Sequence, residues 1–185
     1  MLNFEGDRKA LWKECGCVST GFPVLKHGKL AMCQSTTIQN YICAISPKFK
    51  TMPARARAID AMYFAHVEDL LGDLGKTGLF GQLFGGPPAK TDELKAAVEK
   101  WCGHFEGQAP DSGFINGLEF PTGADSVILV LYKAAAHWKY LFELSGVEKE
   151  AYPKLARLSE RAAAAPGIAE YVAKLSSLSM DPFEK

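Results

Sequence analysis

Residues 22–45, FPVLKHGKLAMCQSTTIQNYICAI, decide the fold of the N-terminal part of the chain. The apolar run Phe22–Leu25 favours a strand, His27-Gly28 favours a tight turn, and Leu30–Cys33 favours the returning strand of a hairpin. Ser35 suits the start of a helix through Ile45, because its hydroxyl can accept a hydrogen bond from a first-turn amide. We therefore predict strand, turn, strand and helix in this order.

Two features of this stretch suit a peptide ligand. Pro23 lacks a backbone N–H and enters a strand at an edge. A cis bond before it would turn the amide and carbonyl of Phe22 outward, where another peptide can pair with them. At Gln34-Ser35 the helix start offers amides and a hydroxyl to a carboxylate. Each feature taken alone is more often structural, since proline in loops and serine at helix starts are both common.

Composition bounds the class of protein. The 185 residues suffice for one compact unit or two small ones. Lys+Arg and Asp+Glu number 21 each, and this balance argues against a general nucleic-acid binder. The five cysteines are odd in number and irregularly spaced, which favours reduced thiols. Cys15-Gly-Cys17 lacks a second ligand pair at zinc spacing, so we predict loop thiols and no metal site there.

Targeting and membrane signals are weak. The N-terminal residues are charged from Glu5 onward and contain no signal-peptide core. The longest apolar run, residues 127–136, is interrupted by Lys133 and is too short to span a bilayer. We therefore expect a soluble, cytoplasmic protein with no membrane span.

The remainder of the chain has a helical pattern. Residues 47–52 separate a small mixed domain, residues 1–46, from an all-helical domain, residues 53–185. The fold class predicted is α+β, mostly α. Gly75–Pro88 is glycine-rich and is expected to be an exposed apolar loop, while Thr122–Asp125 has the form of a capping box before a buried helix. Helical spacing over residues 53–74 is carried by apolar positions and one histidine: Ile59, Met62, Tyr63, His66, Val67, Leu70, Leu71 and Leu74.

The order of these motifs resembles the cytosolic glutathione transferases, most closely the alpha and sigma classes. FPVL, a hairpin, QS-x-x-I-x-x-Y and a long helix follow one another as in that family. Phe114–Gly117 with Phe120–Asp125 resembles the loop and capping box before its core helix. Tyr152–Leu155 with Arg161 resembles its closing helices. The likeness covers roughly residues 5–175. It implies a truncated thioredoxin-like N-terminal piece followed by the family's all-helical C-terminal domain.

The resemblance implies glutathione as the bound substrate. Phe22 beside cis-Pro23 would bind its cysteinyl backbone, and Gln34 with Ser35 would hold its γ-glutamyl end. Trp12 or Lys13 would match the residues that hold the glycyl carboxylate. On the helical domain, the resemblance implies that Asp69, with Glu68 as the alternative, reaches the glutathione bound by the partner in a homodimer. Asp125 would be structural, as a helix cap.

The catalytic group has no counterpart in the printed sequence. The family carries its thiol-activating Tyr, Ser or Cys before the Trp region, and only eleven residues precede Trp12. We therefore expect conjugation to a hydrophobic electrophile only if that part is supplied. The alternative is a non-catalytic binding or structural subunit of a larger assembly, favoured by this missing counterpart and by the apolar segment Leu79–Phe84. His66 lies on the core-facing stripe, and the other histidines form no constellation, so no metal site is predicted.

Overall fold

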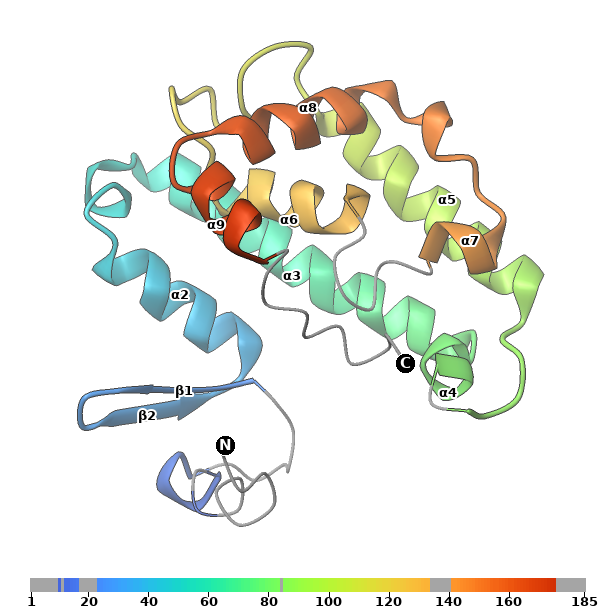
Figure 1. The fold of residues 1–185 in the computed structure, drawn as a ribbon, viewed down its shortest axis with the longest axis horizontal. Coiled ribbons are helices and arrows are strands. Elements are labelled where there is room, and N and C mark those ends of the chain that lie inside the picture. Colours follow the sequence, from blue (N-terminus) through green and yellow to red (C-terminus); the bar gives the residue numbers. More distant parts are fainter. Residues whose placement is uncertain (1–9, 11, 17–22, 84, 134–140, 176–185) are drawn as a thin grey trace. The chain divides into compact units, whose positions relative to one another are not determined.

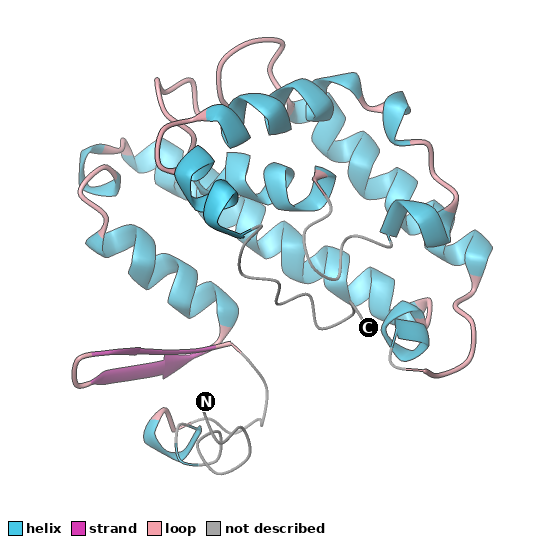
Figure 2. Ribbon diagram, in the orientation of Figure 1, coloured by secondary structure: helices cyan, strands magenta, loops and turns pink. Residues whose placement is uncertain are grey.

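The computed structural model describes residues 10, 12–16, 23–83, 85–133 and 141–175 (Figure 1). The chain divides into two compact units, unit 1 from Met1 to Arg57 and unit 2 from Ala58 to Lys185. Within the described residues the chain is mostly helical, with a small antiparallel sheet (Figure 2). The predicted class, α+β and mostly α, is confirmed.

Unit 1 contains the predicted hairpin. Strand β1 (Val24–His27) pairs antiparallel with β2 (Leu30–Cys33), so that Val24 lies opposite Cys33 and His27 opposite Leu30. The turn is one residue later than predicted, at positions 28 and 29, because Gly28 has a positive φ of 61° and His27 still pairs within the strand. Helix α2 (Ser35–Ile45) follows at once, with the bounds that the sequence predicts.

Side-chain contacts join the elements of unit 1. Nδ1 of His27, at the end of β1, lies 2.7 Å from the Tyr41 hydroxyl on α2. Lys26 forms an ion pair of 2.8 Å with Glu14, which belongs to a short helical turn before the hairpin. Ile38 is the buried residue of α2. The segment after α2 forms a short 3-10 helix, η1 (Phe49–Thr51).

Unit 2 is built from helices. Its longest helix, α3 (Ala54–Lys76), starts just before the boundary between the units, directly after Pro53. Pro153 occupies the first turn of α8, where its missing N–H leaves no helical bond unmade. The remaining helices are α4 (Leu79–Leu83), α5 (Thr91–Gln108), α6 (Gly123–Tyr132), α7 (Leu141–Ser145), η3 (Lys149–Ala151), α8 (Pro153–Ala164) and α9 (Ile168–Leu175).

The core of unit 2 is a continuous apolar cluster around α6, which lies between α3 and α8 in Figure 1. The later part of α6, residues 127–132, reads VILVLY, and Ile128 and Leu131 in this part are buried in the cluster. Fully buried members of the cluster come from helices far apart in sequence: Leu74, Leu94, Phe105, Ile128 and Leu155.

The segment after α3 corrects one prediction. Leu79 is only 2% exposed, and Phe80 and Leu83 pack against the core, so the expected exposed apolar loop is wrong. Phe84 lies outside the described residues. A short helix forms here because Thr77 bonds at both helix ends: its hydroxyl donates to the Leu74 carbonyl at 2.7 Å and accepts from the Leu79 amide at 3.3 Å.

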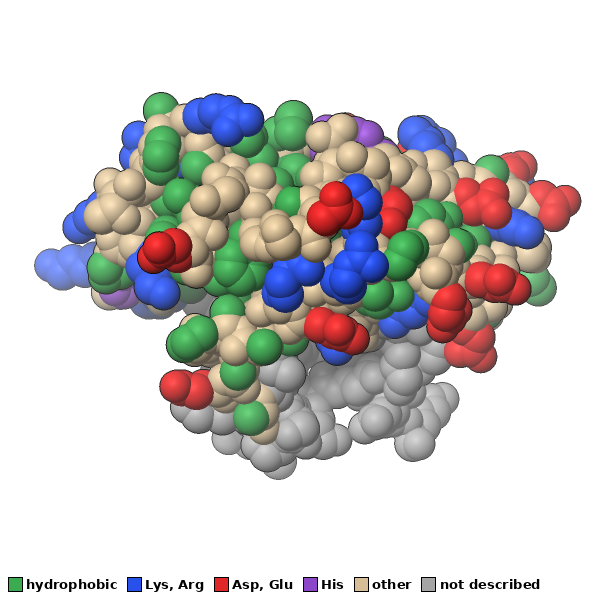
Figure 3. Space-filling view, turned by 90° about the horizontal axis from the view of Figure 1, so that it is seen from above, with side chains coloured by type: hydrophobic (Ala, Val, Ile, Leu, Met, Phe, Trp, Pro, Cys, Tyr) green, Lys and Arg blue, Asp and Glu red, His purple; other side chains and the backbone are tan. Residues whose placement is uncertain are grey.

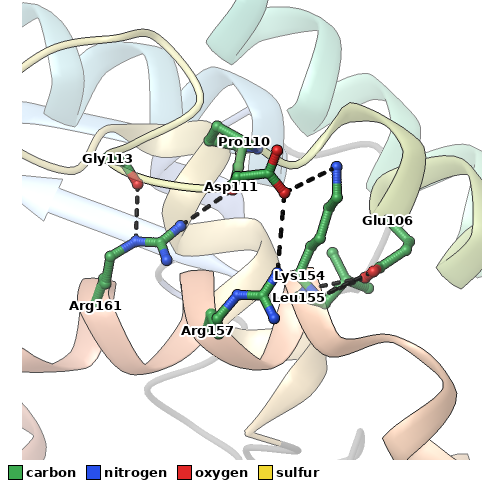
Figure 4. A network of polar contacts seen from close by, with 8 residues as sticks. All are labelled: Glu106, Pro110, Asp111, Gly113, Lys154, Leu155, Arg157 and Arg161. Carbon is green, nitrogen blue, oxygen red and sulfur yellow. Dashed lines mark hydrogen bonds and ion pairs between the residues drawn. The ribbon is translucent and has the colours of Figure 1, made fainter.

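A polar network fastens α8 to the end of α5 (Figure 4). The carboxylate of Glu106 accepts bonds of 2.9–3.1 Å from the amides of Lys154 and Leu155, and thereby caps α8. Arg161 donates to the carbonyls of Gly113 and Pro110 and holds the loop that leads to α6. Figure 3 shows both basic and acidic side chains on the face drawn there, with several acidic side chains gathered at the right of the view.

None of the described helices combines the length and the apolar character needed to cross a membrane.

Candidate functional site

The junction between β2 and α2 carries an unusual backbone. Gln34, the residue before the helix, has φ 77° and ψ 119°, while every other positive φ within the described ranges belongs to glycine. A non-glycine residue with this backbone costs on the order of 1–3 kcal/mol and persists only where its surroundings impose it. The strain lies at the residue that the sequence assigns to ligand binding.

The start of α2 suits an anion. The Gln34 side chain forms no cap to the helix, and the first turn, Ser35-Thr36-Thr37, contains no acidic residue. The amides at a helix start carry partial positive charge that favours a carboxylate. Gln34 is exposed and Ser35 is half-buried, so both can be reached from solvent.

The hairpin places Pro23 at this same end. Val24 pairs with Cys33, so the residues flanking that pair, Pro23 and Gln34, lie at the open end of the ladder, opposite the turn. Pro23 is exposed. The structure therefore brings together three of the sequence-predicted residues, Pro23, Gln34 and Ser35, in one unit.

The other predicted binding residues lie in the turn before the hairpin, in unit 2 or outside the described residues. Trp12 is half-buried and Lys13 is exposed. Both belong to the short helical turn that contains Glu14, and Glu14 forms an ion pair with Lys26 on β1. Phe22 lies outside the described residues. Asp69 is exposed on α3, in unit 2.

The start of α6 shows what a purely structural helix cap looks like in this chain. Asp60 of α3 is 2% exposed, and its carboxylate accepts from the amides of Gly123 and Ala124 at 2.9 and 3.0 Å. It also accepts from the Thr122 hydroxyl at 2.7 Å and from Nδ2 of Asn116 at 2.9 Å. These bonds join α3 to the loop before α6. The sequence did not assign this role to Asp60, because nothing local connects it to residues about sixty positions later.

The predicted capping box at Thr122–Asp125 is confirmed. The Asp125 carboxylate accepts from the amide of Thr122 at 2.8 Å and from that of Ile115 at 2.9 Å. Burial raises the pKa of Asp125 and the charge of Asp60 adds to this, while the bonds from Ile115 and Thr122 oppose it. Both carboxylates serve the helix start, so the site is closed to a ligand.

Two buried groups of unit 2 can be set aside as reactive acids or nucleophiles. Burial, with a smaller contribution from Asp125, raises the pKa of Tyr63 to about 12. Burial and the nearby Glu106 raise the pKa of Cys102 to about 12. At neutral pH both stay protonated, and a thiol reacts through its thiolate.

A histidine pair between α3 and α5 was not foreseen from the sequence. The rings of His66 and His104 are 5.0 Å apart and nearly perpendicular, beside Trp101 and Phe105. Burial, and then the neighbouring His104, lower the pKa of His66, while Asp69 acts in the opposite direction. The pairing depends on how α3 and α5 pack against each other, since the two histidines are 38 residues apart in the sequence, and the periodicity of one helix does not reveal it.

Comparison with protein-family models and with curated proteins gives no match to this chain. Within the described ranges, no three His, Cys, Asp or Glu side chains are already assembled as a metal site. The geometry at the start of α2 therefore carries the functional argument.

Proposed function

We propose that the chain is a glutathione transferase-like protein whose unit 1 binds glutathione at the open end of the hairpin. Pro23, Gln34 and Ser35 form the binding residues that the hairpin brings together. The observation that carries the proposal is the positive φ of Gln34, a strained backbone at the start of a helix with no acidic residue in its first turn.

The strain has a physical use at such a site. Positive φ at Gln34 lets the chain leave β2 and enter α2 without an intervening loop, so the exposed Gln34 side chain and the first amides of α2 lie side by side. A γ-glutamyl group offers a carboxylate to the amides and a polar backbone to the amide side chain. Strained residues cluster at ligand sites, where the surrounding structure holds the backbone in the geometry that ligand binding uses.

The helical unit contributes a second line of support. Its long helix α3, the buried capping box at Thr122–Asp125 and the apolar helix α6 follow in the order that suggested the family. The alternative, a non-catalytic subunit, loses one of its two supporting features, the exposed apolar loop, because Leu79 is buried. Transfer of the bound thiol to a hydrophobic electrophile is the reaction that the likeness implies.

Calorimetric titration with reduced glutathione tests the binding. We expect saturable binding that weakens in Gln34→Ala and in Ser35→Ala, because each removes a polar contact to the γ-glutamyl end. Thr37→Ala, an exposed position of the same helical turn, serves as the matched control and should bind as the parent does.

Two fragments of glutathione separate the ends of the ligand. γ-Glutamylcysteine should compete with glutathione, and cysteinylglycine should not, because Gln34 and Ser35 hold the γ-glutamyl carboxylate. A folded protein that shows no saturable binding, or that prefers cysteinylglycine, would overturn the proposal.

A homodimer belongs to the same proposal. Asp69 is exposed on α3, as a residue that reaches a neighbouring subunit must be, and Glu68 beside it is exposed as well. Sedimentation should therefore give a dimer, and Asp69→Asn should weaken glutathione binding at dimeric concentrations. A monomer that binds glutathione with unchanged affinity in Asp69→Asn would remove Asp69 from the site and leave the role of Gln34 standing.

A further inference from the structure

Two imidazole rings, those of His66 and His104, lie close together where α3 packs against α5. The ring centroids of His66 and His104 are 5.0 Å apart, with their planes at 81°. A metal–imidazole bond is about 2.0–2.1 Å, and the ring centroid lies about 1.2 Å behind the nitrogen, so two imidazoles on one tetrahedral metal have centroids about 5 Å apart. The two rings therefore have the separation that a shared metal ion requires.

A hydrogen-bonding atom of this pair has no partner. Nδ1 of His66 is shielded from solvent and makes no hydrogen bond within the described residues. Ring packing alone also accounts for a perpendicular contact near this distance, but it leaves that nitrogen unsatisfied. A metal ion would use it, because a buried polar atom needs a partner.

The surroundings can supply further oxygen ligands. Asp69 follows His66 by three residues on α3, on the same side of the helix, and its side chain is exposed. His104 is exposed too, so the pair is open to solvent on one side. The nearby cation of Lys100 is held 2.8 Å from Asp73 and lies over the Trp101 ring, so part of its charge is neutralised.

We propose that His66 and His104 bind a divalent transition metal of the Zn²⁺, Ni²⁺ or Cu²⁺ class, with the Asp69 carboxylate recruited as a third ligand. Imidazole nitrogen suits these ions, and a carboxylate completes a common donor set. The third ligand is drawn in on binding, since no three donors are assembled within the described ranges. The two histidines lie in unit 2 and are not among the proposed glutathione-binding residues, with which the metal site shares Asp69 alone.

The test uses the full chain without a histidine tag, stripped of metal with EDTA and titrated with NiCl₂ by calorimetry at pH 7.5. We expect saturable binding of one ion per chain, and a rise in the melting temperature with nickel. X-ray absorption of the nickel complex should show two imidazole nitrogens at about 2.0–2.1 Å.

Variants assign the ligands. His104→Ala and His66→Gln should abolish saturable binding, and Asp69→Asn should weaken it by about tenfold or more, the scale of effect seen for supporting groups around a metal. His104 is exposed, so its variant should fold normally, which circular dichroism checks. His27→Ala, in unit 1, is the matched control and should bind nickel as the parent does.

Three results would overturn the proposal. The first is no saturable binding by the folded parent at millimolar nickel. The second is unchanged affinity in the folded His104→Ala variant. The third is binding that survives both histidine variants and disappears when the cysteines are alkylated, which would place the metal on thiols.

Discussion

The starts of α6 and α2 solve the same physical problem in opposite ways. Each helix begins with amides that lack partners within the helix. At α6 the amides of Thr122, Gly123 and Ala124 all donate to buried carboxylates of the chain itself. At α2 the preceding residue, Gln34, offers no side-chain cap and adopts a strained backbone.

The difference separates a structural helix start from a candidate ligand site. Asp60 connects α3 to the start of α6, so its bonds stabilise the packing of unit 2. No residue of comparable kind occupies the first turn of α2, and an added anion would meet no like charge within that turn. We infer that removing polar groups at α6 costs stability, whereas changing Gln34 mainly alters binding.

The largest effect is expected for Asp60→Ala. The change removes the acceptor of the Gly123 and Ala124 amides, whereas Asn116 and the Thr122 hydroxyl keep a second partner. Each buried amide left unsatisfied costs about 1–3 kcal/mol, so the free energy of unfolding should fall by about 2–6 kcal/mol. Urea denaturation followed by circular dichroism measures the loss. Asp111→Ala is the control, since its side chain is 80% exposed; equal losses in the two variants would contradict the assignment.

A smaller loss is expected for Gly123→Ala at the same helix start. An added Cβ would overlap the Phe64 ring and lie 3.0 Å from Oδ2 of Asp60. Such overpacking costs about 1–3 kcal/mol of stability, measurable as a lower urea midpoint. Gly103→Ala is the matched change, because a Cβ there meets nothing within 4 Å in helix α5. That control should gain up to about 1 kcal/mol from the higher helix propensity of alanine.

Replacing the strained residue at α2 should act in the other direction. Gln34→Gly relieves the positive φ, so local stability of unit 1 should rise by about 0.5–1 kcal/mol although the unfolded chain gains freedom. Glutathione binding should weaken at the same time, because the amide side chain is lost. Hydrogen exchange over residues 23–45 reports the first effect and calorimetry the second. A less protected hairpin in the glycine variant would show that the backbone of Gln34 is not strained.

The smallest effect is expected at a half-buried carboxylate, Asp73. Hydrogen bonds from Lys100, then Lys76 and Trp101, hold the pKa of Asp73 well below its usual 3.8. A lowered carboxyl pKa stabilises the fold above the ordinary value, and this contribution disappears as the pH falls below 3.8 through the lower pKa of the folded state. Asp73→Asn should therefore lower the stability slightly at neutral pH, where the contribution is fully present, and should flatten the acid limb of the stability profile. A profile identical to that of the parent below pH 3.8 would contradict this.

Local sequence signals located most elements of the chain. Ser35 and Ile45 bound α2 as expected, and Thr122–Asp125 forms the predicted capping box, because these patterns act within a few residues. Local sequence patterns gave a wrong prediction where burial in the core decided the structure of a segment. Leu79 was expected in an exposed loop and is buried, since only the packed core shows that its apolar side chain has neighbours.

The features of the candidate sites also divide into those set by local sequence and those set by tertiary packing. The sequence by itself determined the hairpin, the start of α2 and hence the identity of Gln34 and Ser35, because strand alternation, turn residues and helix caps are local properties of the chain. Only the tertiary structure decided the backbone of Gln34, the four bonds to Asp60 and the pairing of His66 with His104. Those features depend on where separate elements come to lie, and burial and packing over the whole unit set that placement.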